Sequence, residues 1–146
     1  MKLKIIVAYF MAFFLFSAST VFGQGPVTEW EVLTSEVMKL YSSGDYTQGV
    51  KVAKRALQVA QQNDGPDHPN VALSLSNLAE LYEAQREYAK AELLYKRSLE
   101  ILEKAFGQDD PFLVPILLNM ASLYNNIGRE NEAHRMMERA NNIQAK

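Results

Sequence analysis

The 146-residue sequence contains no cysteine. Disulfide bonds, thiolate zinc sites, iron–sulfur clusters and cysteine nucleophiles are therefore excluded. An excess of basic residues is also lacking, because the formal net charge is −2, and this argues against a nucleic-acid-binding protein. No stretch shows the alternation typical of a β-strand. Hydrophobic residues make up 48% of the chain, which is enough to build the core of one domain.

Residues 1–23 have the three-part layout of a secretory signal peptide. Lys2 and Lys4 precede an apolar run over residues 5–16, small polar residues follow, and cleavage is expected before Gln24. The apolar run is short for a membrane span, which needs roughly 20 residues. The alternative is an uncleaved anchor in the inner membrane. We therefore predict an exported protein, periplasmic or secreted, whose domain comprises residues 24–146.

An internal repeat organises this domain. Displacing the sequence by 42 residues aligns three units at roughly 26–66, 67–108 and 109–146. The aligned pairs include Gly65 with Gly107, Pro69 with Pro111, Leu75 with Leu117, Asn77 with Asn119, Ala79 with Ala121, Tyr82 with Tyr124 and Ala91 with Ala133. The array is thus expected to stack three similar units.

Each unit is predicted to be a pair of helices. Leu75, Leu78, Ala79 and Tyr82 have the spacing of one helical face. Breaks are expected at residues 43–45, 85–87 and 127–129, and a capping box at Thr28. Pro115 would clash inside a helix begun at Pro111, so we expect the fifth helix to start near Val114 or to be kinked there. Small residues such as Gly49 mark close helix contacts.

The stretches from Asp67 to Ala72, Asn77 to Tyr82 and Tyr88 to Tyr95 resemble the tetratricopeptide repeat, in the 42-residue form found in kinesin light chains. The resemblance covers nearly all of residues 24–146. It implies an all-α fold, a right-handed α-α superhelix of about three helix pairs. It also implies a concave groove, lined by the first helix of each pair, that holds segments of partner proteins.

The groove that this resemblance implies would be lined by side chains of three helices. These are Thr34, Met38, Tyr41, Asn77, Glu80, Glu83, Asn119, Ser122, Asn125 and Asn126. Asparagine amides both donate and accept hydrogen bonds, so Asn77 and Asn119 are candidates to clamp an extended peptide. The alternative is that they bond to a neighbouring helix and fix the repeat register.

Charge predicts the type of partner. The three first helices carry Glu29, Glu31, Glu36, Glu80 and Glu83 against one base, Lys39. A neutral or basic partner segment is therefore favoured over an acidic one. The alternative is that these glutamates only solvate exposed helix faces.

Catalysis is not expected from this sequence. His68 and His134 lack an oriented nucleophile, and the aspartates near residues 67 and 109 resemble helix caps more than metal ligands. We predict no catalytic residue, no metal and no cofactor, and therefore no enzyme.

The last helix offers a second candidate surface. Met120, Met136, Met137 and Ile143 are expected to form an apolar strip that no further helix covers, available for self-association or a docked partner. The alternative is that the tail folds over it. The leading prediction is an exported, non-catalytic adaptor that binds a protein or peptide. Self-association into a structural array and an envelope-anchored accessory subunit are the alternatives.

Overall fold

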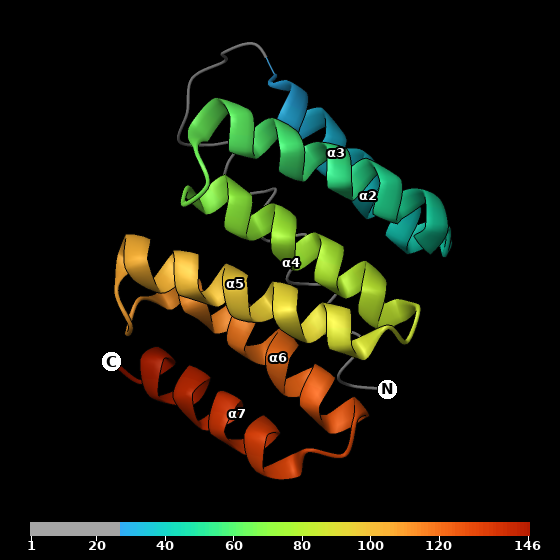
Figure 1. The fold of residues 1–146 in the computed structure, drawn as a ribbon. Helices are drawn as coiled ribbons and strands as arrows, with labels where there is room; N and C mark the ends of the chain where they lie inside the picture. Colours follow the sequence, from blue (N-terminus) through green and yellow to red (C-terminus); the bar gives the residue numbers. More distant parts are fainter. Residues whose placement is uncertain (1–26) are drawn as a thin grey trace.

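The computed structural model describes residues 27–146, and the segment predicted to be a signal peptide lies outside them. Within this range the chain is helical and contains no strand. The elements are α2 (Glu29–Ser43), α3 (Tyr46–Asp64), α4 (Pro69–Ala84), α5 (Tyr88–Phe106), the 3-10 turn η1 (Pro111–Leu113), α6 (Val114–Asn126) and α7 (Glu130–Gln144). None of these helices is long and apolar enough to cross a bilayer. The predicted all-α fold is confirmed (Figure 1).

The turn inside each helix pair falls at the same repeat position. Gly44, Arg86 and Gly128 stand 42 residues apart, and all three have left-handed backbone conformations with φ of 80°, 62° and 74°. Glycine adopts this conformation without strain, whereas the Cβ of an arginine is sterically strained in it. The three predicted breaks are confirmed, and Arg86 is the one that departs from the best residue for the turn.

Helix starts also follow the predicted signals. The Thr28 hydroxyl accepts from the backbone N–H of Glu31, whose carboxylate accepts from the backbone N–H of Thr28 at 2.7 Å, forming the expected capping box. Asp110 caps the short turn η1, and the α-helix then begins at Val114. Pro115 occupies the first turn of α6, where its missing N–H costs no helical hydrogen bond.

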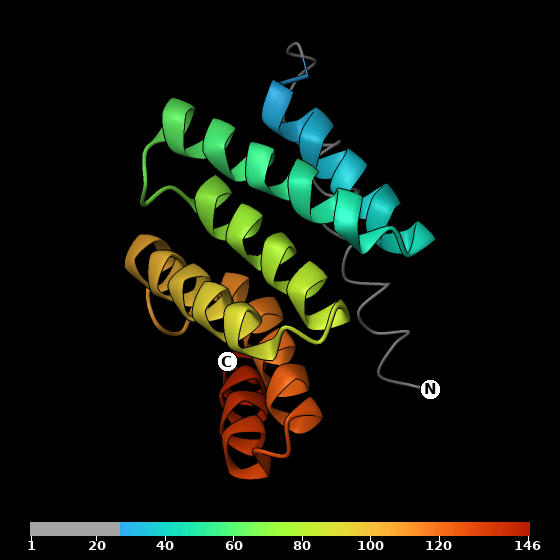
Figure 2. The ribbon, with the colours of Figure 1, turned by 45° about the vertical axis from the view of Figure 1, so that its right-hand side comes forward.

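The helices stack in chain order, each packing against the next (Figures 1 and 2). The first helices of the three pairs also touch in sequence, α2 with α4 and α4 with α6. We call these three helices the first-helix row. The row is continuous across the whole array, so side chains from different repeats meet along it.

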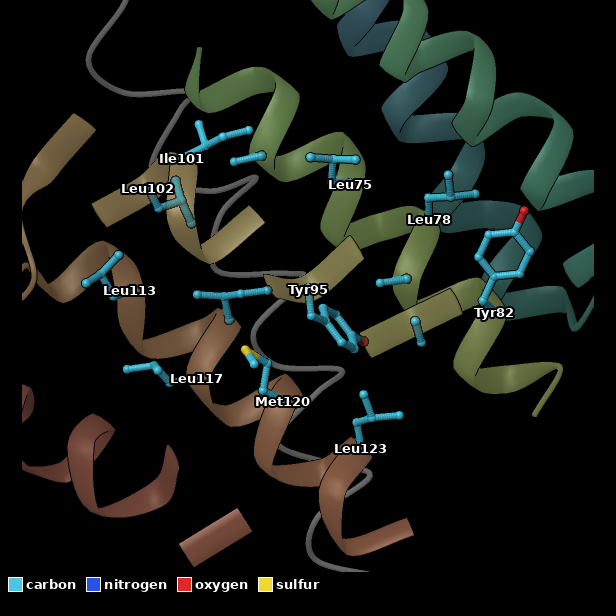
Figure 3. Close-up of a cluster of buried hydrophobic side chains, with 14 of the residues drawn as sticks. Leu75, Leu78, Tyr82, Tyr95, Ile101, Leu102, Leu113, Leu117, Met120 and Leu123 are labelled. Atoms are coloured by element: carbon cyan, nitrogen blue, oxygen red, sulfur yellow. The ribbon is translucent and has the colours of Figure 1, made fainter. Parts of the chain in front are cut away.

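Apolar residues at repeat positions fill the space between helices. Figure 3 shows residues from three helices, including Leu78 of α4, Tyr95 of α5 and Leu117 of α6, in one cluster. A Cβ added to Gly49 of α3 would lie 2.7 Å from a methyl group of Leu81, which is fully buried. The absence of a side chain at residue 49 thus lets α3 approach α4, as predicted.

The apolar strip expected on the last helix is not uncovered. Met120 and Ile143 are only 3% and 4% exposed, and Met136 is partly buried against the core. Met137 alone of the four is well exposed, at 43%. The prediction failed because α6 and α7 pack against each other and α6 also packs against α5, which linear spacing does not specify.

At the two outward faces of the array, positions that are buried and apolar in the middle pair are exposed, and all but Met137 of the residues compared are polar. Tyr95 and Leu102 of α5 are buried, but the equivalent residues of α7 are Met137 and Gln144, both exposed. At the other end, exposed Glu36 of α2 stands where α4 has buried Leu78. Polar outer faces are characteristic of helices that need no further repeat stacked on them.

Candidate functional site

The residues expected to line the groove lie on the first-helix row, most of them at three equivalent repeat positions. The positions are Ser35, Asn77 and Asn119; Met38, Glu80 and Ser122; and Tyr41, Glu83 and Asn125. Within each set, the residues come from α2, α4 and α6 respectively. The two glutamates of α4 therefore lie at the centre of the row, with one helix on either side.

Within the described residues, Glu80 makes one hydrogen bond, and its partner belongs to another repeat. The side-chain amide of Asn119 on α6 donates to Glu80 Oε1 at 2.8 Å. The second oxygen, Oε2, is inaccessible to water and has no hydrogen-bond partner within the described chain. Burial raises the pKa of Glu80 to about 7; neighbouring Glu83 also raises it, and the hydrogen bond from Asn119 opposes the rise. Glu80 is thus a carboxylate whose charge is poorly compensated by this chain.

Glu83, one turn further along α4, is better satisfied by hydrogen bonds. It accepts from the hydroxyl of Tyr95 at 3.1 Å and from the amide of Asn126 at 2.7 Å. Burial raises the pKa of Glu83, while the hydrogen bonds from Tyr95, Asn126 and Ser122 oppose that rise. Through Glu83, helices α4, α5 and α6 meet in one polar cluster.

Tyr41 brings the first repeat into this cluster. Burial raises its pKa to about 12, and the charge of Glu80 adds to the rise. Its ring contacts that of Tyr46 at a centroid distance of 5.6 Å. We call Tyr41, Glu80, Glu83 and Tyr95 the acidic cluster. All three helix pairs contribute to it or contact it.

The acidic cluster contains no cation. Within the described residues, neither Glu80 nor Glu83 forms a salt bridge. Glu92 on α5 provides the contrast, because Lys96 and Arg129 both lie within 3.0 Å of its carboxylate and hold its pKa below the usual range. Within residues 27–146, lysine and arginine side chains therefore pair with Glu92 on α5 and not with Glu80 or Glu83 on the first-helix row.

Two of the asparagines on the first-helix row bond to a neighbouring helix, and two are left available to bind a partner. Asn119 and Asn126 bond to glutamates of the neighbouring helix and hold α6 in register with α4. Asn77 is partly exposed, Asn125 is exposed, and neither makes a side-chain hydrogen bond within residues 27–146. These two amides are free to bind something else.

The remaining expected residues lie nearer the first repeat. Met38 is partly buried, and the hydroxyl of Thr34 is buried with no partner among the described residues. Three of the five acids counted for the groove lie elsewhere. Glu29 pairs with Arg55 at 3.0 Å, Glu31 closes the capping box, and Glu36 is on the outward face of α2. The acidic character of the row thus comes from Glu80 and Glu83.

The participation of Tyr95 was not predicted from sequence. Its ring is fully buried. Only its hydroxyl, which reaches Glu83, belongs to the cluster. A buried tyrosine hydroxyl usually has a hydrogen-bond partner, and that general rule was the one available signal.

His68 and Asp67, two of the groups considered for catalysis, have structural partners, and His134 is exposed. The ring of His68 accepts a hydrogen bond from the N–H of Asn70 and caps α4. Asp67 pairs with Arg97 at 2.7 Å and with Lys104 at 2.6 Å. In the part of the chain that the structure describes, no three histidine or carboxylate side chains are grouped to hold a metal.

Comparison with known proteins places this fold in a class. Residues 40–104 match the model of the tetratricopeptide repeat. The structure of BtubC (BKLC) from P. vanneervenii is similar, with a TM-score of 0.75 and 23% identity over 90% of this chain and 52% of that one. TPR-like repeats of a Podosopora anserina protein described as a kinesin light chain give 0.71 and 21%, over 79% of this chain and 55% of that one.

The fold is therefore an α-solenoid of tetratricopeptide type, and residues 40–104 carry the repeat itself. The predicted solenoid of about three helix pairs is confirmed. This chain spans about half the length of the two solved structures. No curated protein sequence matches it significantly.

Proposed function

We propose that this protein is a non-catalytic adaptor that holds a segment of another protein along the first-helix row. The observation that carries the proposal is the set of unused polar groups on that row. The amide of Asn77 and the second oxygen of Glu80 have no partner in the described chain, although other polar groups of the same helices are bonded. A partner backbone or side chain would satisfy them.

Export is part of the proposal and rests on the sequence of residues 1–23. The adaptor would then act in the periplasm or outside the cell. Retention of the leader would instead make it an accessory subunit anchored to the inner membrane. The mass of the protein isolated from its cells distinguishes these outcomes, because cleavage before Gln24 removes the first 23 residues.

Self-association into a structural array is the competing function. Exposed Met137 favours it, but the polar residues at the other outward positions, such as Gln144 and Glu36, do not. Stable interfaces between identical subunits usually have an apolar centre. The adaptor function is therefore the better supported of the two.

The test is capture of a partner from the cells that make the protein. The full-length chain, leader included and tagged at its C-terminus, is compared with Asn77→Lys on the first-helix row and Leu93→Lys on α5. Both substitutions introduce the same charge, and Leu93 is strongly exposed. Capture of one protein by the parent and the Leu93 variant, but not by a folded Asn77 variant, supports the proposal. Capture that ignores Asn77→Lys contradicts it.

A further inference from the structure

The two carboxylates at the centre of the first-helix row differ from other partly buried carboxylates such as Glu92, Glu103 and Glu132, which are paired with cations. Glu92 has two cations against it, whereas Glu80 has none in the part of the chain that the structure describes. No lysine or arginine of α4 or α6 is available to change this, because neither helix contains one. Lys39, the one base of α2, is exposed and forms no salt bridge within the described residues, so the first helices do not supply Glu80 with a compensating cation.

One oxygen of Glu80 also lacks a hydrogen-bond donor. Asn119 satisfies Oε1, but Oε2 has no partner among residues 27–146 and is out of contact with water. A buried charged oxygen without a donor is costly. An ammonium or guanidinium group supplies both the donor and the opposite charge, and such charge-assisted hydrogen bonds are the strong ones.

We propose that the acidic cluster is the anchor for one lysine or arginine side chain of the partner segment. This inference rests on the proposed function and names the chemistry of its central contact. Glu80 Oε2 accepts from the cation, and the charge of Glu83 adds to the attraction. The hydroxyl of Tyr95 donates to Glu83, and burial together with the charges of Glu80 and Glu83 raises the pKa of both Tyr41 and Tyr95.

Access to the site requires a movement of one side chain. The residue Glu80 as a whole is partly exposed although its Oε2 is not. Rotation about the side-chain torsions therefore carries the carboxylate toward solvent without moving the backbone. The bond from Asn119 restrains this rotation, and a bound cation would have to compete with it.

Protons and the cation compete for the same carboxylate. The groups that face Glu80 are Tyr41 from α2, Glu83 on its own helix, Tyr95 from α5 and the uncharged amide of Asn119 from α6. None of these is a cation. Binding of a cation should thus lower the pKa of Glu80, and binding should be tighter above neutral pH than below it.

The test uses small probes in place of the unidentified partner. n-Butylammonium and propylguanidinium represent the two side chains, and 1-butanol is the uncharged control. The carboxyl carbon shift of Glu80 is followed by nuclear magnetic resonance in the purified protein. We expect saturable shifts with both cations and not with butanol, and a lower pKa of Glu80 in their presence.

Matched variants, titrated through the backbone amide shifts of α4 so that the readout survives each substitution, locate the binding. Glu80→Gln and Glu83→Gln should each raise the half-saturating cation concentration about tenfold. Glu138→Gln, at an exposed residue of α7, should not change it. Equal cation binding by all three variants, or no response of Glu80 to the cations in the parent protein, overturns the inference. Unchanged capture of a partner by Glu80→Gln also overturns it, while leaving the adaptor function in place.

Discussion

The amide of Asn119 donates to Glu80 across the junction between the second and third helix pairs, at 2.8 Å. Among residues 27–146 it is the one hydrogen bond of Glu80, a carboxylate that burial has made difficult to ionise. It joins α6 to α4 at the residue that we propose as the centre of partner binding. Register between repeats and the properties of the site therefore depend on the same contact.

Substitution of Asn119 by alanine should destabilise the fold by about 1–3 kcal/mol, because both oxygens of a buried carboxylate then lack a donor. The loss should be larger at pH 8 than at pH 5, since the charged form needs the donor more. Urea denaturation of the purified variant measures it. Asn125→Ala is the control, because Asn125 is exposed and unbonded, and it should change the unfolding free energy by less than about 0.5 kcal/mol. Equal effects of the two substitutions would contradict the role of Asn119.

The stability of the parent protein should carry a contribution that falls as pH rises. The folded pKa of Glu80, about 7, exceeds its ordinary value of 4.5. The neutral form is therefore the one that folding favours, so this contribution is complete below pH 4.5 and is lost as pH rises to about 7. We expect the loss between pH 5 and pH 8 to be about 2 kcal/mol.

Glu80→Gln isolates this contribution from other titrating groups, since glutamine has no charge to lose. The difference in unfolding free energy between parent and variant should change by that amount between the two pH values. Carboxylates with lowered pKa, such as Glu92, act in the opposite sense but are common to both proteins. A difference independent of pH would show that Glu80 titrates normally in the folded protein.

Arg86→Gly should stabilise the protein by about 1 kcal/mol, because glycine adopts the left-handed conformation without the penalty that a Cβ incurs. Thermal or urea unfolding checks the direction. Gly44→Ala, at the equivalent turn of the first repeat, should destabilise by a similar amount. If both substitutions changed stability with the same sign, backbone strain would not be the cause.

The outward face of α7 should not drive assembly, because Gln144 and the other exposed residues replace the apolar side chains that α5 uses to contact α6. Sedimentation equilibrium should give a monomer mass over a wide range of concentration, and Met137→Glu should leave it unchanged. A dimer that dissociates in the Met137 variant would favour the self-associating function over the adaptor.

The sequence predicts the helix pairs well because local signals specify them. Gly44 and Gly128 mark turns, and the spacing of Leu75, Leu78 and Tyr82 marks a buried face. It does not predict which residues of successive repeats meet. That depends on how far each pair is rotated relative to the next. The rotation brings Asn119 of α6 to Glu80 of α4, whereas Asn77, the repeat equivalent of Asn119, lies on the same helix as Glu80 and does not bond to it.

The same limit explains the error on the last helix. Spacing alone identified Met120 and Ile143 as apolar positions, but their burial depends on the packing of α6 against α5 and α7. The acidic character of the row was also overestimated by counting whole helices. Glu29 is on a first helix, yet it reaches Arg55 on α3.

Site-specific photo-crosslinking in the cells that make the protein tests the central claim most directly. A photoreactive amino acid is placed at position 77 on the first-helix row, or at position 93 on the exposed surface of α5. The account predicts a crosslink from position 77 to one other protein, and none to that protein from position 93. A crosslink from position 93 alone, or from position 77 only to a second copy of this chain, would contradict the claim that the first-helix row binds the partner.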